Sequence, residues 1–175
     1  MKIFDLDGTL ADCEHRRHLV DPLANGHYVF GRGERPGWIN PSTGEKFKPR
    51  WKEFFEACDK DKRIHATCNI VQMMLACDDD PYFEIWSGRC ESVRQKTIDW
   101  LEINIDPTKD WGLRLKMRPI GDSTPDDQLK EKWLDEASAE GEHIEFVFDD
   151  RPKVVRMWRR RGIFVFNCAQ HDGEF

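Results

Sequence analysis

Short apolar runs rich in aromatic and β-branched residues recur along the chain, and polar residues or glycine bound them. Examples are FEIW at 83–86 and EFVF at 145–148. Runs of this length and composition are typical of buried β-strands. The pattern therefore predicts five strands, at Lys2–Leu6, Tyr82–Trp86, Leu113–Met117, Ile144–Phe148 and Ile163–Asn167.

Between these runs, apolar residues recur at the spacing of amphipathic helices. Predicted helices cover Glu91–Asn104 and Pro152–Arg161, and Ile64–Cys77 leads the chain back to the second strand. A further helix should begin with Thr124 as its cap, Pro125 at the first helical position and two aspartates in the first turn. Strands that alternate with helices predict an α/β fold, with a mainly parallel sheet covered on both faces.

Charged and hydroxyl side chains follow three of the predicted strands. Asp5 and Asp7 end the first strand, Ser87 ends the second, and Asp149 and Asp150 end the fourth. Ligands of parallel sheets bind beyond the carboxyl ends of the strands. A buried carboxylate costs stability unless it is paired or bound to a cation, and that cost is tolerated mostly at sites that do chemistry. We therefore expect these residues to share one functional edge of the sheet.

Residues 11–63 do not follow the alternation of strands and helices. The stretch 25–50 is dense in glycine, proline, asparagine and serine, which predicts loops and a hairpin. Trp51–Lys60 has the pattern of a short amphipathic helix. We predict a core of residues 1–10 and 64–175, with 11–63 as a cap inserted after the first strand. Such a segment could fold over the site as a lid that excludes water and completes specificity.

Composition and charge narrow the class of protein. The chain has 175 residues and a formal net charge of −6. An acidic protein does not attract nucleic acid by its bulk charge, so a nucleic-acid substrate would need a local basic patch. No run approaches the roughly 18 apolar residues of a membrane helix, and MKIFDLDG lacks the pattern of a signal peptide. We expect a cytosolic protein without a membrane partner. The candidate basic patches are Arg16-Arg17, Lys116 with Arg118, and Arg156 with Arg159–Arg161.

Two other patterns carry little weight. The six cysteines include no CxxC pair, which in a cytosolic protein predicts thiols rather than disulfides. Cys13, His15 and His18 lie close together, but their spacing fits no standard zinc site. No GxxxxGK[ST] motif occurs, so the sequence predicts no P-loop kinase domain.

Four motifs together resemble the haloacid dehalogenase superfamily of phosphotransferases. They are DLDGTLAD, SGR, a lysine in a helix and FDDR, in that order. The resemblance implies a Rossmann-like three-layer sandwich, with Asp5 as the nucleophile that forms an aspartyl-phosphate and Asp7 as general acid. Dehalogenases of this superfamily lack the second aspartate, so its presence favours phosphoryl transfer over cleavage of a carbon–halogen bond.

The same resemblance implies Mg²⁺ as cofactor. Its ligands would be Asp5, Asp149, Asp150 and the main-chain carbonyl of Asp7, which fits the preference of this ion for oxygen ligands. Ser87 would donate to a phosphoryl oxygen. Lys130 would supply a positive charge to the phosphate and to Asp5, and Lys132 remains an alternative for this role.

Two further stretches resemble the phosphatase domain of phage-type polynucleotide kinase–phosphatases. They are MRPIGDSTPDDQLKEKWL and DDRPKVVRMWRRRGIFVFNCAQHDGEF. The resemblance implies removal of 3′-phosphates from nucleic-acid ends and catalytic support from Arg89. This sequence departs from the bifunctional enzymes in having no counterpart of their kinase half, so we do not expect 5′-phosphorylation. The insertion is longer here and could build a pocket for one small substrate, so a nucleoside monophosphate phosphatase remains the alternative. Candidate substrate-binding residues are Thr9, Gly88, Arg89, Asp126 and Arg151, together with Arg16 and Arg17.

Overall fold

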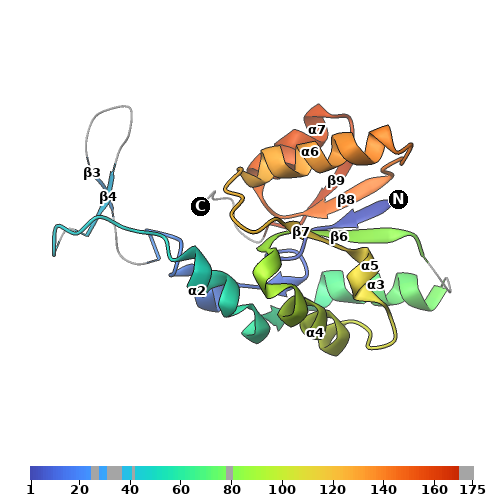
Figure 1. The fold of residues 1–175 in the computed structure, drawn as a ribbon, viewed down its shortest axis with the longest axis horizontal. Coiled ribbons are helices and arrows are strands. Elements are labelled where there is room, and N and C mark those ends of the chain that lie inside the picture. Colours follow the sequence, from blue (N-terminus) through green and yellow to red (C-terminus); the bar gives the residue numbers. More distant parts are fainter. Residues whose placement is uncertain (25–27, 31–36, 41, 78–80, 170–175) are drawn as a thin grey trace.

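The structure, a computed structural model, describes residues 1–24, 28–30, 37–40, 42–77 and 81–169. In this part of the chain, five parallel strands form one sheet in the order β7-β6-β1-β8-β9 (Figure 1). Ile3 of the central strand lies opposite Glu84 on one side and Val147 on the other. The predicted α/β fold with a parallel sheet is confirmed. The strands are β1 (Lys2–Phe4), β6 (Phe83–Cys90), β7 (Leu115–Arg118), β8 (Phe146–Asp149) and β9 (Phe164–Asn167).

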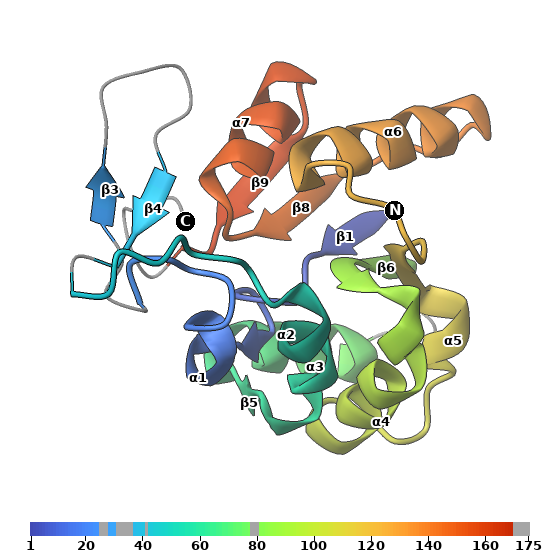
Figure 2. The ribbon, with the colours of Figure 1, turned by 60° about the vertical axis from the view of Figure 1, so that its left-hand side comes forward.

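Helices cover both faces of the sheet, as Figure 2 shows. One face packs against α6 (Asp126–Ala139) and α7 (Pro152–Arg160), and the other against α3 (His65–Cys77), α4 (Arg94–Asn104) and α5 (Trp111–Arg114). A 3₁₀ turn, η2 (Glu91–Val93), precedes α4. Because successive strand residues point to opposite faces, Ile3 packs in one core cluster and Phe4 in the other.

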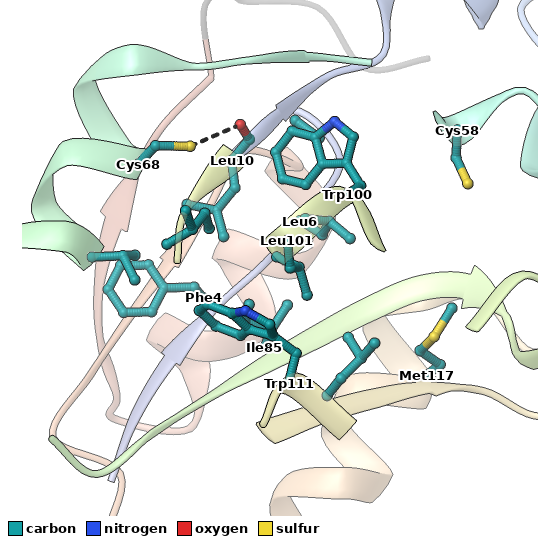
Figure 3. Packing of buried hydrophobic residues seen from close by; sticks show 14 of the residues in the cluster. Phe4, Leu6, Leu10, Cys58, Cys68, Ile85, Trp100, Leu101, Trp111 and Met117 are labelled. Carbon is teal, nitrogen blue, oxygen red and sulfur yellow. Dashed lines mark hydrogen bonds between the residues drawn. The ribbon is translucent and has the colours of Figure 1, made fainter. Parts of the chain in front are cut away.

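Large side chains fill the core on the α3–α5 side of the sheet. Figure 3 shows Phe4, Ile85, Trp100, Leu101 and Trp111 together there, and all five are at most 2% exposed. Each buried aromatic ring removes a large apolar area from water. This packing fixes the position of β1, whose carboxyl end carries the aspartates.

The structure corrects several predicted boundaries. β1 ends at Phe4 rather than Leu6, and β7 begins at Leu115 because Leu113 belongs to α5. Ser87 does not end its strand: β6 continues to Cys90, and its pairing with β7 shifts register after Ser87. The sixth helix begins one residue later than predicted, because Pro125 adopts an extended conformation and is itself the N-cap.

Antiparallel pairing of two short strands brings the ends of residues 11–63 together. β2 (Ala11–Asp12) pairs with β5 (Lys62–Arg63), so the chain between them can leave the core and return. The predicted helix at Trp51–Lys60 is α2 (Trp51–Glu56) followed by a 3₁₀ turn, η1 (Cys58–Lys60). The division into core and cap remains a prediction. The other elements of this segment are α1 (Glu14–Arg17) and the hairpin strands β3 (Tyr28–Phe30) and β4 (Gly37–Ile39).

Two predictions concern residues outside the described set, namely most of the predicted hairpin loop and the last six residues of the family-like C-terminal stretch. Among the described helices, none combines the length and the apolar composition that crossing a bilayer requires.

Candidate active site

Three carboxylates meet at the carboxyl edge of the sheet. Asp5 follows β1, Asp149 ends β8, and Asp150 is the next residue. Each offers one oxygen, and these atoms all lie within 4.8 Å of one another. Asp5 and Asp149 are almost inaccessible to water, at 5% and 0% exposed. Adjacent parallel strands therefore place these carboxylates together, although they are more than 140 positions apart in the sequence.

The electrostatic environment of this cluster leaves it short of positive charge. Burial raises the pKa of Asp5 to about 6, with Lys130 opposing the shift and Asp149 adding to it. Burial, followed by Asp5 and Asp149, raises the pKa of Asp150 to about 9. Within the described residues, the buried Oδ1 atom of Asp150 has no hydrogen-bond partner. A cluster of carboxylate oxygens with an unused buried acceptor fits a hard divalent cation such as Mg²⁺.

Lys130 supplies the one ammonium group in direct contact with these carboxylates in the described structure. Its Nζ lies 2.5 Å from Asp5 Oδ1 and 2.8 Å from Asp149 Oδ2. Burial opposes its charge, but Asp149 and Asp5 outweigh burial and raise the pKa of Lys130. Lys132, the alternative, has a 72% exposed side chain and points toward Glu136. The geometry therefore places Lys130, not Lys132, in the site.

Gly8 allows Asp150 to approach the first motif. Its φ is +85°, a conformation that glycine adopts without strain, and a Cβ atom there would overlap the Asp150 carboxylate. The DLDG motif therefore needs glycine for two reasons: the backbone has a positive φ, and the Asp150 carboxylate leaves no room for a side chain.

Asp7 lies in a second group of charges beside the cluster. Its Oδ1 accepts hydrogen bonds from Arg16 Nη2 at 2.8 Å and from Arg89 Nε and Nη2 at 2.8 and 2.5 Å. Burial would raise the pKa of Asp7, but Arg89 and Arg16 outweigh it and lower the pKa. The Asp7 side chain remains 22% exposed, whereas the side chains of Arg16 and Arg89 are buried.

Asp61 holds the two arginines, and sequence reasoning missed it. Its buried carboxylate accepts from Arg16 Nε and Nη2 at 2.7 and 2.6 Å and from Arg89 Nη2 at 2.5 Å. His15 Nε2 lies 2.8 Å from Asp61 Oδ1, so His15 belongs to the same group of side chains. In the sequence, Asp61 sits between lysines in DKDK and looks like a surface residue. No spacing rule distinguishes it, because its partners come from α1 and β6.

A third group lies between the end of β6, around Ser87 and Gly88, and the start of α6. Ser87 is fully buried, and its Oγ accepts a hydrogen bond from Arg89 N at 3.2 Å. Arg118 and Arg151 both pair with Asp126, and Arg118 Nε also donates to the Gly88 carbonyl at 3.0 Å. A Cβ at Gly88 would lie 2.9 Å from Asp126 Oδ1. Arg118 was predicted as part of an exposed basic patch, and this is corrected: it is buried and internally bonded.

Two other predicted substrate contacts have partners within the protein. The Thr9 side chain is fully buried, and Thr9 O accepts from the Thr67 hydroxyl. Arg17 lies beside Asp21 and Glu14, with its Nε 3.0 Å from Asp21 Oδ2. Among the described residues, the acidic cluster of Asp5, Asp149 and Asp150 is the group of side chains that could hold a metal.

This fold and this site define a phosphatase of the haloacid dehalogenase type. Its parts are a parallel sheet with paired aspartates after β1, a serine after the middle of β6, a lysine from α6 and two aspartates at the end of β8. The chain belongs to the family described as polynucleotide kinase PNKP phosphatase domain, whose sequence profile matches residues 46–175. That match begins after Asp5 and Asp7.

Similar proteins agree with this family. The chain is 32% identical over 130 residues to the "Putative bifunctional polynucleotide kinase/RNA ligase" of Autographa californica nuclear polyhedrosis virus, a match that covers 73% of this chain and 18% of the viral protein. Two solved structures, titled "Structure of the Pnkp1/Rnl/Hen1 RNA repair complex" and "Structure of Pnkp1/Rnl/Hen1 complex", contain a chain 26% identical to it with a TM-score of 0.62. These matches cover 98% of this chain and 43% and 46% of those chains. The chain thus spans less than half the length of these relatives.

Proposed function

We propose that this protein removes 3′-phosphates from polynucleotide ends, with Asp5 as a covalent nucleophile and Mg²⁺ as cofactor. The observation that carries the proposal is the convergence of Asp5, Asp149, Asp150 and Lys130 at one sheet edge beside Asp7 and its two arginines. The family and the repair proteins it resembles supply the substrate class.

In the first half of the reaction, an oxygen of Asp5 attacks phosphorus and the bond from phosphorus to the ribose oxygen breaks. Lys130, already 2.5 Å from Asp5, neutralises charge between the incoming phosphate and the carboxylates. The Ser87 oxygen accepts from Arg89 N, which leaves its own proton to donate to a phosphoryl oxygen. Covalent catalysis of this kind replaces one difficult step with two easier ones.

Asp7 moves the protons of both halves. It gives a proton to the leaving oxygen, and it then takes one from the water that attacks phosphorus and releases Asp5. Arg89 and Arg16 hold the pKa of Asp7 low in the substrate-free protein, which suits the second task. A dianionic phosphate that draws these guanidinium groups toward itself would raise the pKa of Asp7, which suits the first.

Mg²⁺ would be held by Asp5, Asp149 and Asp150, with the main-chain carbonyl of Asp7 as a further ligand. The fit rests on three convergent oxygen donors and on the unused Oδ1 of Asp150. When bound, the ion would neutralise the phosphate and stabilise charge that develops in the transition state.

A substrate panel tests the proposal. With MgCl₂ present, the protein should release phosphate from a 3′-phosphorylated oligonucleotide and from an aryl phosphate, and excess EDTA should abolish both. Asp5→Asn should abolish turnover while its thermal unfolding stays close to that of the parent.

Higher kcat/KM on free 3′- or 5′-mononucleotides than on the oligonucleotide would establish the alternative, a nucleotidase. Absence of turnover on every member of the panel would overturn the phosphatase proposal itself.

A further inference from the structure

A basic and aromatic stretch of the cap stands out in an otherwise acidic protein. Residues 46–52 read KFKPRWK, four cations and two aromatic rings in seven residues of a chain with net charge −6. Lys46 and Lys48 are exposed. Trp51 is 48% exposed, so part of its ring is accessible to a ligand.

Contacts connect this stretch to the catalytic edge. The Arg50 amide donates to the Leu19 carbonyl at 2.8 Å, which anchors the stretch to the segment after α1. The Trp51 ring packs edge-on against Phe54 at 5.8 Å between centroids. Arg16 lies over the Phe54 ring at 4.0 Å and donates to Asp7. Trp51 is therefore two ring contacts away from a guanidinium group of the active site.

The views of the whole molecule agree with these contacts. In Figures 1 and 2 the chain that joins β4 to α2 lies at the end of the molecule toward which β1 and β8 point. The carboxylates lie at this same end. A ligand that extends from the active site across the cap would meet this stretch.

We infer that Lys46–Lys52 bind the single-stranded part of a polynucleotide substrate, on the 5′ side of its terminal phosphate. Trp51 supplies a stacking surface for a base, and Lys46, Lys48 and Lys52 supply charge for the phosphates. Exposed rings beside cations are the means by which proteins bind single strands without reading their sequence. The inference rests on the proposed function and adds the place where the polymer, rather than the terminal phosphate, is held.

Ion pairs with neighbouring glutamates decide which side chains of this stretch are available to bind the strand. Arg50 pairs with Glu53 at 2.8 Å, so the inference does not depend on it. Lys52 lies 3.8 Å from Glu56, but its side chain is 88% exposed, and such surface pairs are weak. Trp51, Lys46 and Lys48 are therefore the residues to test.

The experiment measures binding of a fluorescent oligo(dT) strand with a 3′-phosphate, in an Asp5→Asn background so that the ligand is not consumed. Trp51→Ala should weaken binding by about 5- to 150-fold, the range for loss of one stacked base, and Trp51→Phe should retain most of it. Lys46→Ala with Lys48→Ala should reduce the slope of log affinity against log salt by about 1.4, at about 0.7 for each phosphate contact on a single strand.

Matched controls use surfaces away from the catalytic edge. Tyr82→Ala removes a ring that is 50% exposed, and Arg159→Ala with Arg160→Ala removes two exposed cations of α7. Neither should change binding. Hydrolysis of an aryl phosphate, measured with Asp5 intact, should be unchanged by the Lys46 and Lys48 variants, because this substrate has no polymer to bind.

The outcomes separate the two proposals. Unchanged oligonucleotide binding in the Trp51 and lysine variants would overturn this inference, as would equally tight binding of duplex DNA or equal displacement by polyglutamate. If the parent protein did not hydrolyse the aryl phosphate, the phosphatase proposal would be overturned, whatever the binding measurements show.

Discussion

At the scale of single residues, two groups of buried charges at the catalytic edge have different balances. In one, three carboxylates face a single ammonium group; in the other, two carboxylates face two guanidinium groups. The first group therefore needs a further cation and the second does not, which is why we place Mg²⁺ in the first. The groups are Asp5, Asp149 and Asp150 with Lys130, and Asp7 and Asp61 with Arg16 and Arg89.

Gly8→Ala tests the close approach of Asp150 to the first motif. The added Cβ would overlap the Asp150 carboxylate, and φ at this position is +85°. We expect activity to fall by at least about 100-fold, since displacements on the order of 1 Å at a reacting centre have that effect. The measurement is kcat on an aryl phosphate.

Gly141→Ala is the control for backbone strain alone. Its φ is +87° and a Cβ there would meet nothing within 4 Å. It should lower stability slightly and leave kcat unchanged. Equal kcat for the Gly8 variant and the parent protein would contradict the arrangement of Asp150 described here.

At the scale of elements, the sequence predicted the strands better than the cap. All five predicted strands overlap observed ones. The three inner strands, β6, β1 and β8, are buried on both faces and read as continuous apolar runs. Their ends were less certain: Leu113 and Ser87 were misplaced, since helix α5 and the register shift after Ser87 depend on tertiary packing. The role of Asp61 could not be predicted, because it depends on Arg16 and Arg89, which α1 and β6 bring to it.

The motif residues, by contrast, needed only their order along the chain. Asp5 and Asp149 follow from the rule that parallel strands present their carboxyl ends at one edge. Their convergence in the structure reflects that rule, whereas Arg118 was misjudged because local sequence does not show that Asp126 would bury it.

Asp61→Asn tests the connection between the cap and β6. The amide keeps the size of the side chain but removes the charge that two buried guanidinium groups share. Breaking a buried ion pair costs about 3–5 kcal/mol, so we expect a lower free energy of unfolding in urea. We also expect lower kcat under conditions where the variant is still folded, because Arg16 and Arg89 would no longer be held beside Asp7.

Asp21→Asn provides the comparison within the same segment. Asp21 is also buried, at 5% exposed, but its ion pair is with Arg17, whereas Asp61 pairs with the two arginines beside Asp7. It should lose stability without a change in kcat. If Asp61→Asn kept the kcat of the parent protein, the positioning role of Asp61 would be wrong.

At the scale of the whole molecule, folding places acidic residues where water is excluded. The stability of the fold therefore depends on a cation bound to these residues. The carboxylates that would hold Mg²⁺ terminate or follow the adjacent strands β1 and β8. Lys130 offsets part of the repulsion among them, and the packing of both core clusters resists the rest. Metal binding should therefore raise the unfolding temperature of the whole protein, because a ligand that binds the folded state alone stabilises it.

Asp150→Asn should separate two effects of the acidic cluster, the loss of stability from its repulsion and the gain of stability from metal binding. The pKa of Asp150 is raised to about 9 in the folded protein, whereas an unfolded aspartate titrates near about 3.9. A raised pKa means that the folded state binds more protons, so stability falls as pH rises between these values.

In EDTA, the variant should therefore melt a few degrees above the parent, with a difference that grows from about pH 5 to about pH 8. In MgCl₂ the order should reverse, because the parent gains stability from the ion and the variant has lost a ligand. Asp99→Asn, at an exposed position of α4, should follow the parent in both buffers. Equal stabilisation of the Asp150 variant and the parent by Mg²⁺ would show that the ion binds elsewhere.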